Sequence, residues 1–148
     1  MLNMYKCRFF SIQELVSKQV YNRYGEFAWR FFDDAFKQDI DMIRNFHGQG
    51  LTINNWLFGG NNEQCGLRSN LDPMVKNKTT LYCSPHCMGK AVDLHSKDNA
   101  KLWKDCKWLI ETGKLRTIKR IESQESTKNL WVHVDSFGTN EEIEIFKD

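Results

Sequence analysis

Residues 84–95 have the sequence SPHCMGKAVDLH, which combines several residue types that bind metal ions. His86 and Asp93 can supply two metal ligands if the chain folds back at Gly89. Small residues at Gly89 and Ala91 suit such a turn, because the backbone must pass close to the metal. A catalytic zinc ion takes three protein ligands and leaves a fourth position for water, so a third ligand must come from elsewhere in the chain.

That ligand is available in residues 130–136, LWVHVDS, whose alternation of apolar and polar residues predicts a β-strand. Alternate side chains of a strand point to opposite faces, so Trp131, His133 and Asp135 share one face. The apolar residues between them are expected to face the core. His133 can then complete a metal site with His86 and Asp93, and Trp131 can form a wall beside it.

The remaining elements must position these two motifs. Three segments have the apolar spacing of helices, and a glycine follows each of them. We expect these helices from Ser11 to near Gly25, over residues 33–46, and from Ser96 to Gly113.

The rest of the chain predicts a small sheet. A short strand is expected at 51–56, and a Gly/Asn-rich connection then runs to about residue 84. Residues 116–123 and 129–136 read as a β-hairpin. We therefore expect one α+β domain over residues 1–148, with a small, mostly antiparallel sheet flanked by helices. An N-terminal helical segment (1–32) would precede the catalytic core (33–148).

Composition and charge argue against a disordered chain, a nucleic-acid-binding protein, a membrane-spanning protein and a disulfide-rich scaffold. Hydrophobic residues make up 41% of the chain, which is typical of a globular protein. The net charge of +2 is too small to predict a nucleic-acid partner. We expect no signal peptide, because residues 1–16 carry polar residues every few positions, and the sequence has no apolar stretch long enough for membrane insertion. Its five cysteines match no disulfide framework, which favours a reducing compartment.

The two metal motifs together carry a resemblance. Residues 84–93 resemble the S-x-H-x-x-G-x-A-x-D motif of the zinc D-alanyl-D-alanine carboxypeptidases and L-alanyl-D-glutamate endopeptidases, and WVHVD is similar to their second motif. TINNWLFGG…GLRS looks like a modified form of their upstream strand and arginine turn. The resemblance covers roughly residues 40–137. It implies the fold that these peptidases share with the hedgehog signalling domain and with lysostaphin-type zinc peptidases.

The resemblance also implies roles for individual residues. His86, Asp93 and His133 become the ligands of a Zn²⁺ ion. Arg68 takes the position of an arginine that holds a substrate carboxylate or carbonyl, a task that suits a guanidinium group. Ser84 falls on the motif serine, at the side where substrate binds.

The general base is the point where the chain departs from the family. Many members carry a glutamate three residues before the last ligand, where this chain has Leu130. Asp135 or Glu122 can substitute for it. Pairing Ser123 with Leu130 across the hairpin would place Glu122 on the face of the site and Arg120 opposite His133. A register shifted by one residue would turn Glu122 away.

The cysteines and the other histidines allow further interpretations. Cys83, His86 and Cys87 could form part of a structural zinc site, although a second pair of ligands is lacking, and a cysteine nucleophile is conceivable. His47 and His95 are expected to have ordinary structural roles, with a supporting role at the metal open for His95.

The favoured function is a zinc metallopeptidase that hydrolyses a peptide bond in the stem peptides of bacterial peptidoglycan, of the carboxypeptidase or the endopeptidase (endolysin) type. The alternatives are an inactive zinc-binding domain with a virion structural or wall-binding role, and a peptidase for free D-amino-acid dipeptides. We expect a monomer that binds no nucleic acid. Without a signal peptide, the setting that fits is a bacteriophage protein, made in the cytoplasm of the bacterial host and acting on the wall after lysis or within a virion.

Overall fold

The computed structural model describes residues 3–138 and 142–148. The fold is α+β, and the four strands form one mixed sheet in the order β1-β3-β2-β4. Strand β3 pairs antiparallel with β1 and β2, whereas β4 pairs parallel with β2. The strands are β1 (Ala91–Leu94), β2 (Arg120–Glu122), β3 (Val132–Asp135) and β4 (Glu144–Phe146).

The expected mostly antiparallel sheet is corrected by β4. This strand is only three residues long, and the alternation of glutamate and isoleucine over residues 142–145 is a short local strand signal that the expected topology did not include. Its backbone pairs register by register with β2, from Arg120 opposite Glu144 to Glu122 opposite Phe146. Local alternation is compatible with a strand here, whereas the parallel pairing with β2 is a tertiary contact that local sequence does not specify.

Eight short or medium helices accompany the sheet in the described residues. They are α1 (Ile12–Leu15), α2 (Lys18–Tyr24), the 3₁₀ helix η1 (Gly25–Phe31), α3 (Asp34–His47), the 3₁₀ helices η2 (Trp56–Phe58) and η3 (Pro85–Met88), α4 (Asn99–Glu111) and α5 (Gln124–Thr127). Within this part of the chain, none of the helices combines the length and the apolar character needed to cross a membrane.

The first expected helix is divided in two. Val16 is extended between α1 and α2, and its carbonyl oxygen accepts hydrogen bonds from the side chains of Asn54 and Trp56. Ser17 then caps α2 by accepting from the backbone N–H of Val20. Helix α3 is present as expected and ends at Gly48 in the left-handed conformation.

Helix α4 starts later than expected. Asp98 caps it by accepting from the N–H of Lys101, while Ser96 is engaged with the ring of His47. The strand expected at 51–56 is also absent, because only Thr52 pairs, with His95, before the chain turns into η2.

The hairpin of β2 and β3 is confirmed, but its register differs from the expected one by two residues. Arg120 lies opposite Asp135 instead of His133. The two strands are joined by α5 and its flanking residues rather than by a tight turn, and this connection sets the register. A shift of two residues keeps every side chain on its face. Glu122 and His133 therefore still share the face of the candidate site.

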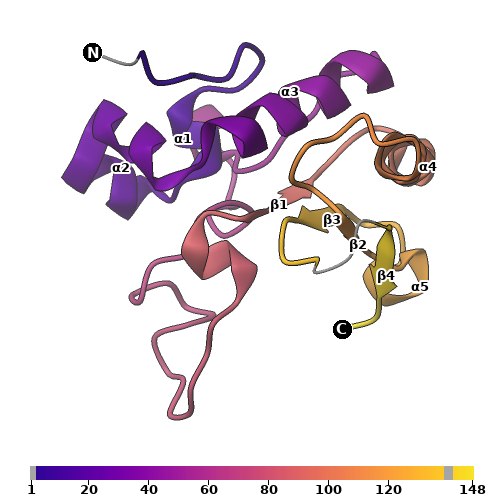
Figure 1. Cartoon of the computed structure of the whole chain (residues 1–148). Coiled ribbons are helices and arrows are strands. Elements are labelled where there is room, and N and C mark those ends of the chain that lie inside the picture. Colours follow the sequence, from indigo (N-terminus) through magenta and orange to yellow (C-terminus); the bar gives the residue numbers. More distant parts are fainter. Residues whose placement is uncertain (1–2, 139–141) are drawn as a thin grey trace.

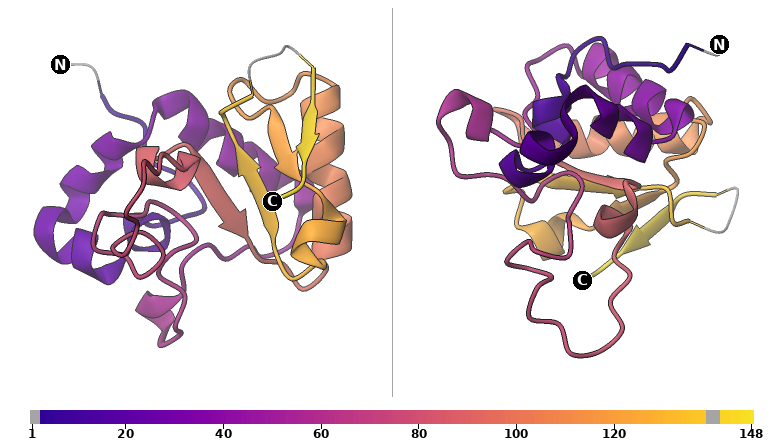
Figure 2. Two further views of the ribbon diagram at one scale, coloured as in Figure 1. Left: turned by 90° about the horizontal axis from the view of Figure 1, so that it is seen from below. Right: turned by 90° about the vertical axis from the view of Figure 1, so that its left-hand side faces the viewer.

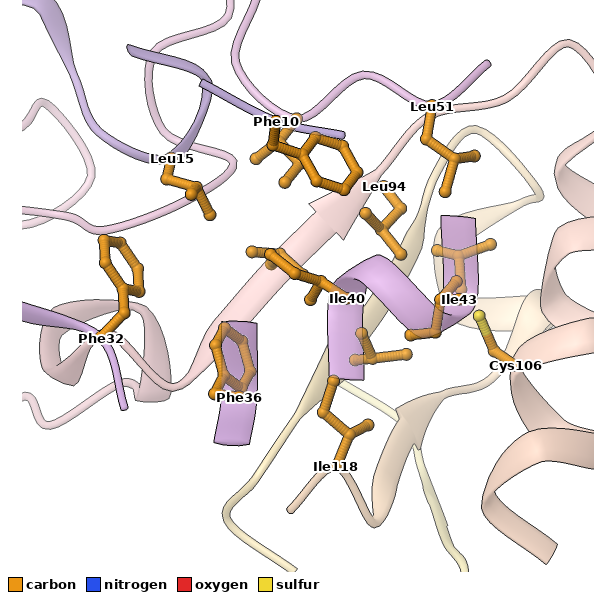
Figure 3. Packing of buried hydrophobic residues seen from close by; sticks show 14 of the residues in the cluster. Phe10, Leu15, Phe32, Phe36, Ile40, Ile43, Leu51, Leu94, Cys106 and Ile118 are labelled. Carbon is orange, nitrogen blue, oxygen red and sulfur yellow. The ribbon is translucent and has the colours of Figure 1, made fainter. Parts of the chain in front are cut away.

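The two longest helices and the long connection lie on opposite sides of the sheet (Figures 1 and 2). Helices α3 and α4 pack on one face of the sheet (Figure 2). The connection between η2 and η3 extends beyond the other face, on the side where the C-terminus of the chain lies (Figures 1 and 2). Figure 3 shows Ile40 and Ile43 of α3 packed beside Leu94 of β1, within a single core cluster that also includes residues of the N-terminal segment. One face of the sheet is thus free to carry polar side chains.

A carboxylate on α3 anchors the chain segment that leads into β2. Asp39 is buried and accepts hydrogen bonds from the backbone N–H groups of Arg116, Thr117 and Ile118 and from the hydroxyl of Thr117. These contacts tie the segment before β2 to the helical layer, and so fix where Arg120 and Glu122 emerge.

Candidate metal centre

Two of the expected ligands come from neighbouring strands. Asp93 on β1 lies directly opposite His133 on β3 in the antiparallel register. The residues that alternate with them on these strands, such as Val92 and Val134, are fully buried in the core. The apolar alternation therefore places Asp93 and His133 side by side on the free face of the sheet.

The third ligand comes from the turn that precedes β1. His86 lies on η3, whose first turn is capped by the side chain of Ser84, which accepts from the N–H of His86. Gly89 ends this turn with φ +67°, and a Cβ on Gly89 would lie 2.3 Å from the carbonyl oxygen of Phe31. The need for glycine here comes from the turn and from the close approach of Phe31, rather than from the metal as expected.

The three ligand atoms converge. The distances between them are 2.9 Å (His133 Nδ1 to Asp93 Oδ1), 3.2 Å (His86 Nε2 to His133 Nδ1) and 3.4 Å (His86 Nε2 to Asp93 Oδ1). Zinc–ligand bonds of about 2.0–2.1 Å in a tetrahedral site separate neighbouring ligand atoms by about 3.3 Å. The spacing of the three atoms therefore fits a zinc ion.

The hydrogen bonds on the outer sides of both rings fix the position of their protons. His86 Nδ1–H donates to the carbonyl oxygen of Gly66 at 2.9 Å, and His133 Nε2–H donates to Asp135 Oδ2 at 2.7 Å. Each neutral ring then turns a lone pair toward the other ring and toward the Asp93 carboxylate. Three electron-pair donors in a buried place require a cation between them, and ligand histidines anchored in this way are typical of metal sites.

In the absence of a metal, a proton takes this place. Burial alone would lower the pKa of His133, but its hydrogen bonds to Asp135 and Asp93 outweigh that effect and raise the pKa to about 9. Burial would raise the pKa of Asp93, but hydrogen bonds from His133 and His86 hold it well below its usual range. The cluster is thus built for a positive charge.

Asp135 lies behind His133, away from the ligand atoms. Its side chain is fully buried, and its two oxygens accept hydrogen bonds from His133, from the guanidinium group of Arg120 and from the N–H of Phe137. Burial would raise the pKa of Asp135, but these donors lower it. The contacts assign Asp135 to orienting His133.

A cavity of about 400 Å³ opens above the ligands. It brings together every residue expected at the site except Asp135, and it is lined in part by Tyr82, Arg120, Phe146 and Asp148 as well. The residues expected from the sequence that line it are Arg68, Ser84, His86, Asp93, Glu122, Trp131 and His133.

Arg68 and Glu122 flank the ligands within this cavity. The Nε–H of Arg68 donates to the carbonyl oxygen of Gln64 at 2.8 Å, and its Nη2 lies 3.5 Å from Asp93 Oδ2. Continuing the register of β2 and β3 by one pair places Glu122 across from His133. Burial raises the pKa of Glu122, although Ser126 and His133 oppose the shift.

Two contributors to the site carry no recognisable motif. Gly66 acts through its backbone carbonyl, so no side chain indicates its role. A Cβ on Gly66 would lie 2.1 Å from the carbonyl oxygen of Leu15, and this close approach is the only hint that glycine is needed there. The role of Arg120 depends on the strand register, which cannot be read from local preferences.

The alternative ligands find no support in the geometry. Among the described residues, His86, Asp93 and His133 form the group of potential ligands that converges, and Cys83 and Cys87 do not belong to it.

His47 has the expected structural role. It joins Asp105 (2.7 Å) and Ser96 (2.8 Å), which resembles a nucleophilic triad. However, the Ser96 oxygen also accepts from the N–H of Asp98, so this cluster links α3 to the start of α4. His95 is half-buried, and its Nδ1 has no hydrogen-bond partner among residues 3–138 and 142–148, so no contact links it to the ligands there.

Comparison with family models, with curated proteins and with solved structures finds no match for the chain.

Proposed function

We propose that the chain is a zinc-dependent metallopeptidase that hydrolyses a peptide bond in the stem peptides of bacterial peptidoglycan. The observation that carries this proposal is the convergence of three lone-pair donors, His86, Asp93 and His133, at the base of a cavity that also holds a carboxylate and a guanidinium group. Two nitrogens and one carboxylate oxygen are a ligand set typical of catalytic zinc, with one position left for water.

Several residues that line the cavity have a task in such a reaction. A zinc ion at these ligands supplies Lewis acidity, which polarises a carbonyl group and lowers the pKa of a water molecule. Glu122 is the base that accepts the proton of the attacking water and passes it to the leaving amine, a role that its raised pKa favours. Arg68 binds a carbonyl or carboxylate oxygen of the substrate beside Asp93.

The remaining residues shape the binding site. Trp131 forms one wall of the cavity, and Ser84 offers its hydroxyl from the turn that carries His86. Asp135 holds His133 and takes no proton from substrate, since both of its oxygens are already occupied. The substrate class itself rests on the resemblance of the two sequence motifs to peptidases of D-alanyl stem peptides.

Digestion of purified peptidoglycan by the zinc-loaded protein tests this proposal, with mass spectrometry of the released products. Glu122→Gln should lower the rate by about 10²–10⁴-fold, the usual contribution of a general base, while zinc stays bound. Glu125→Gln is the matched control, because Glu125 is exposed on α5 and pairs with Lys147 outside the cavity. Zinc-loaded protein that cleaves neither peptidoglycan nor stem peptides would refute the proposal.

One observation favours a second candidate, a zinc-containing module that binds wall peptides without cutting them. Leu130, at the position where related peptidases carry their glutamate base, is 63% exposed. This candidate predicts that the zinc-loaded protein sediments with purified cell walls and releases no product. Release of product that depends on Glu122 would exclude it.

A further inference from the structure

An ion pair with three short contacts joins Arg120 and Asp135 behind the metal centre. Arg120 Nε lies 2.9 and 3.1 Å from the two oxygens of Asp135, and Nη2 lies 2.9 Å from Oδ2. Arg120 on β2 and Asp135 on β3 are directly paired in the antiparallel register, so their ion pair joins two adjacent strands. Paired contacts of this kind fix the plane of a carboxylate, which a single hydrogen bond does not.

Strand β4 fixes the guanidinium group in turn. The Arg120 guanidinium carbon lies 4.1 Å from the centre of the Phe146 ring, and Arg120 Nη1 lies 3.9 Å from Glu144 Oε1. The same Phe146 ring meets the ring of His133 edge-on, at 5.5 Å between centres. Arg120 is therefore held between a buried carboxylate and an aromatic ring that also contacts the metal-ligand histidine.

We propose that Arg120 is a positioning residue of the metal centre: it fixes the Asp135 carboxylate, which holds His133 Nε2–H and so aims His133 Nδ1 at the metal. The proposal rests on the metal site of the proposed function and extends it to β2 and β4. It explains why the parallel strand β4 belongs to the working site, although none of its residues is a ligand.

A lysine could not replace Arg120 in this role. An ammonium group is a point charge with rotating donors, whereas the planar guanidinium binds both carboxylate oxygens at once. Arg120→Lys should therefore keep the charge and lose part of the orientation. Arg120→Gln should lose both.

The test is zinc affinity, measured by competition with a chromophoric chelator at fixed pH. Arg120→Gln should weaken zinc binding about tenfold, at the lower end of the usual effect of a residue behind a ligand, and Arg120→Lys should have an intermediate effect. The visible spectrum of bound Co²⁺ should change in both variants, because the direction of His133 changes. Arg116→Gln is the matched control, since Arg116 is bonded to Gln38 on the outer side of α3.

A double-mutant cycle separates positioning through Asp135 from an independent structural effect. If Arg120 acts through Asp135, Arg120→Gln should cause no further loss of zinc affinity in an Asp135→Asn background. Losses that simply add, or an Arg120→Gln affinity within about twofold of wild type, overturn the proposal. If Arg120→Gln does not fold, the Arg120→Lys cycle gives the same comparison.

The outcome also distinguishes this inference from the proposed function. Wild-type protein that binds zinc but shows no effect of Arg120 overturns the positioning role alone. Wild-type protein that binds zinc and cleaves no peptide, with Arg120 coupled to Asp135, upholds the positioning role and removes the peptidase. Protein that binds no zinc removes both.

Discussion

Replacing Gly66 by alanine should damage the metal centre from a distance, without touching a ligand. The added Cβ would lie 2.1 Å from the carbonyl oxygen of Leu15, where contacts below 3.0 Å essentially never occur. The backbone must therefore move by about 1 Å, and overpacking of this kind costs about 1–3 kcal/mol.

The displacement reaches His86 through the Gly66 carbonyl, which accepts its Nδ1–H at 2.9 Å. Neighbouring backbone bonds, from Asp93 to Cys65 and from Leu67 to Leu15, lie on the same segment and move with it. We expect zinc affinity to fall about 10–100-fold, which is typical when the partner of a ligand histidine is disturbed. The thermal midpoint of the metal-free protein should fall by about 3–12 °C.

Gly50→Ala is the control for this experiment, because a Cβ on Gly50 would meet nothing within 4 Å in the described part of the chain and its φ is not positive. Thermal unfolding of the metal-free proteins and chelator competition for zinc give the two measurements. Gly66→Ala protein with the stability and the zinc affinity of Gly50→Ala would refute the reasoning from backbone contact.

Four further predictions concern Arg68, His133 and Asp39. Arg68→Lys should raise KM for stem peptides about tenfold or more in steady-state assays while zinc content is unchanged, because Lys cannot bind an oxygen pair; an unchanged KM would remove Arg68 from substrate binding. Zinc binding at pH 7 should release about one proton, since the pKa of His133 is about 9 without metal, and calorimetry in buffers of different ionisation enthalpy measures this release. For the same reason His133 should stabilise the metal-free fold below about pH 6.5, and this contribution should be lost as the pH rises through 9; stability that stays level over this range would contradict the assignment. Asp39→Asn should lower the free energy of unfolding in urea by about 2–3 kcal/mol, because a buried amide N–H₂ would face backbone N–H donors; a loss below about 0.5 kcal/mol would show that this anchor contributes little.

The candidate site was more predictable from the sequence than the sheet around it. His86, Asp93 and His133 lie where apolar alternation and glycine punctuation place them, because both signals are local to β1, η3 and β3. Helix α3 is similarly local, with its apolar face and its glycine stop.

The sheet depended on contacts that local sequence does not encode. The register of β2 against β3 follows from the insertion of α5, and the parallel pairing of β4 with β2 is a tertiary contact that the alternation of residues 142–145 does not reveal. The break at Val16 coincides with hydrogen bonds from the side chains of residues 54 and 56 to its carbonyl oxygen, which local sequence does not reveal, whereas Ser17 is a local signal for the start of α2. Glu122 lies on the expected face of the sheet, the one that carries the candidate site. This prediction held only because the observed register differs from the expected one by two residues, and an even shift keeps each side chain on its face.

The most direct test of the account is the zinc content of the purified protein by native mass spectrometry. Wild type supplied with zinc should carry about one ion per chain, His133→Ala should carry none, and His95→Ala should match wild type, since His95 lies outside the converging group. Wild type that stays free of zinc, or His133→Ala that binds it as tightly as wild type, would contradict the claim that η3, β1 and β3 build one metal centre.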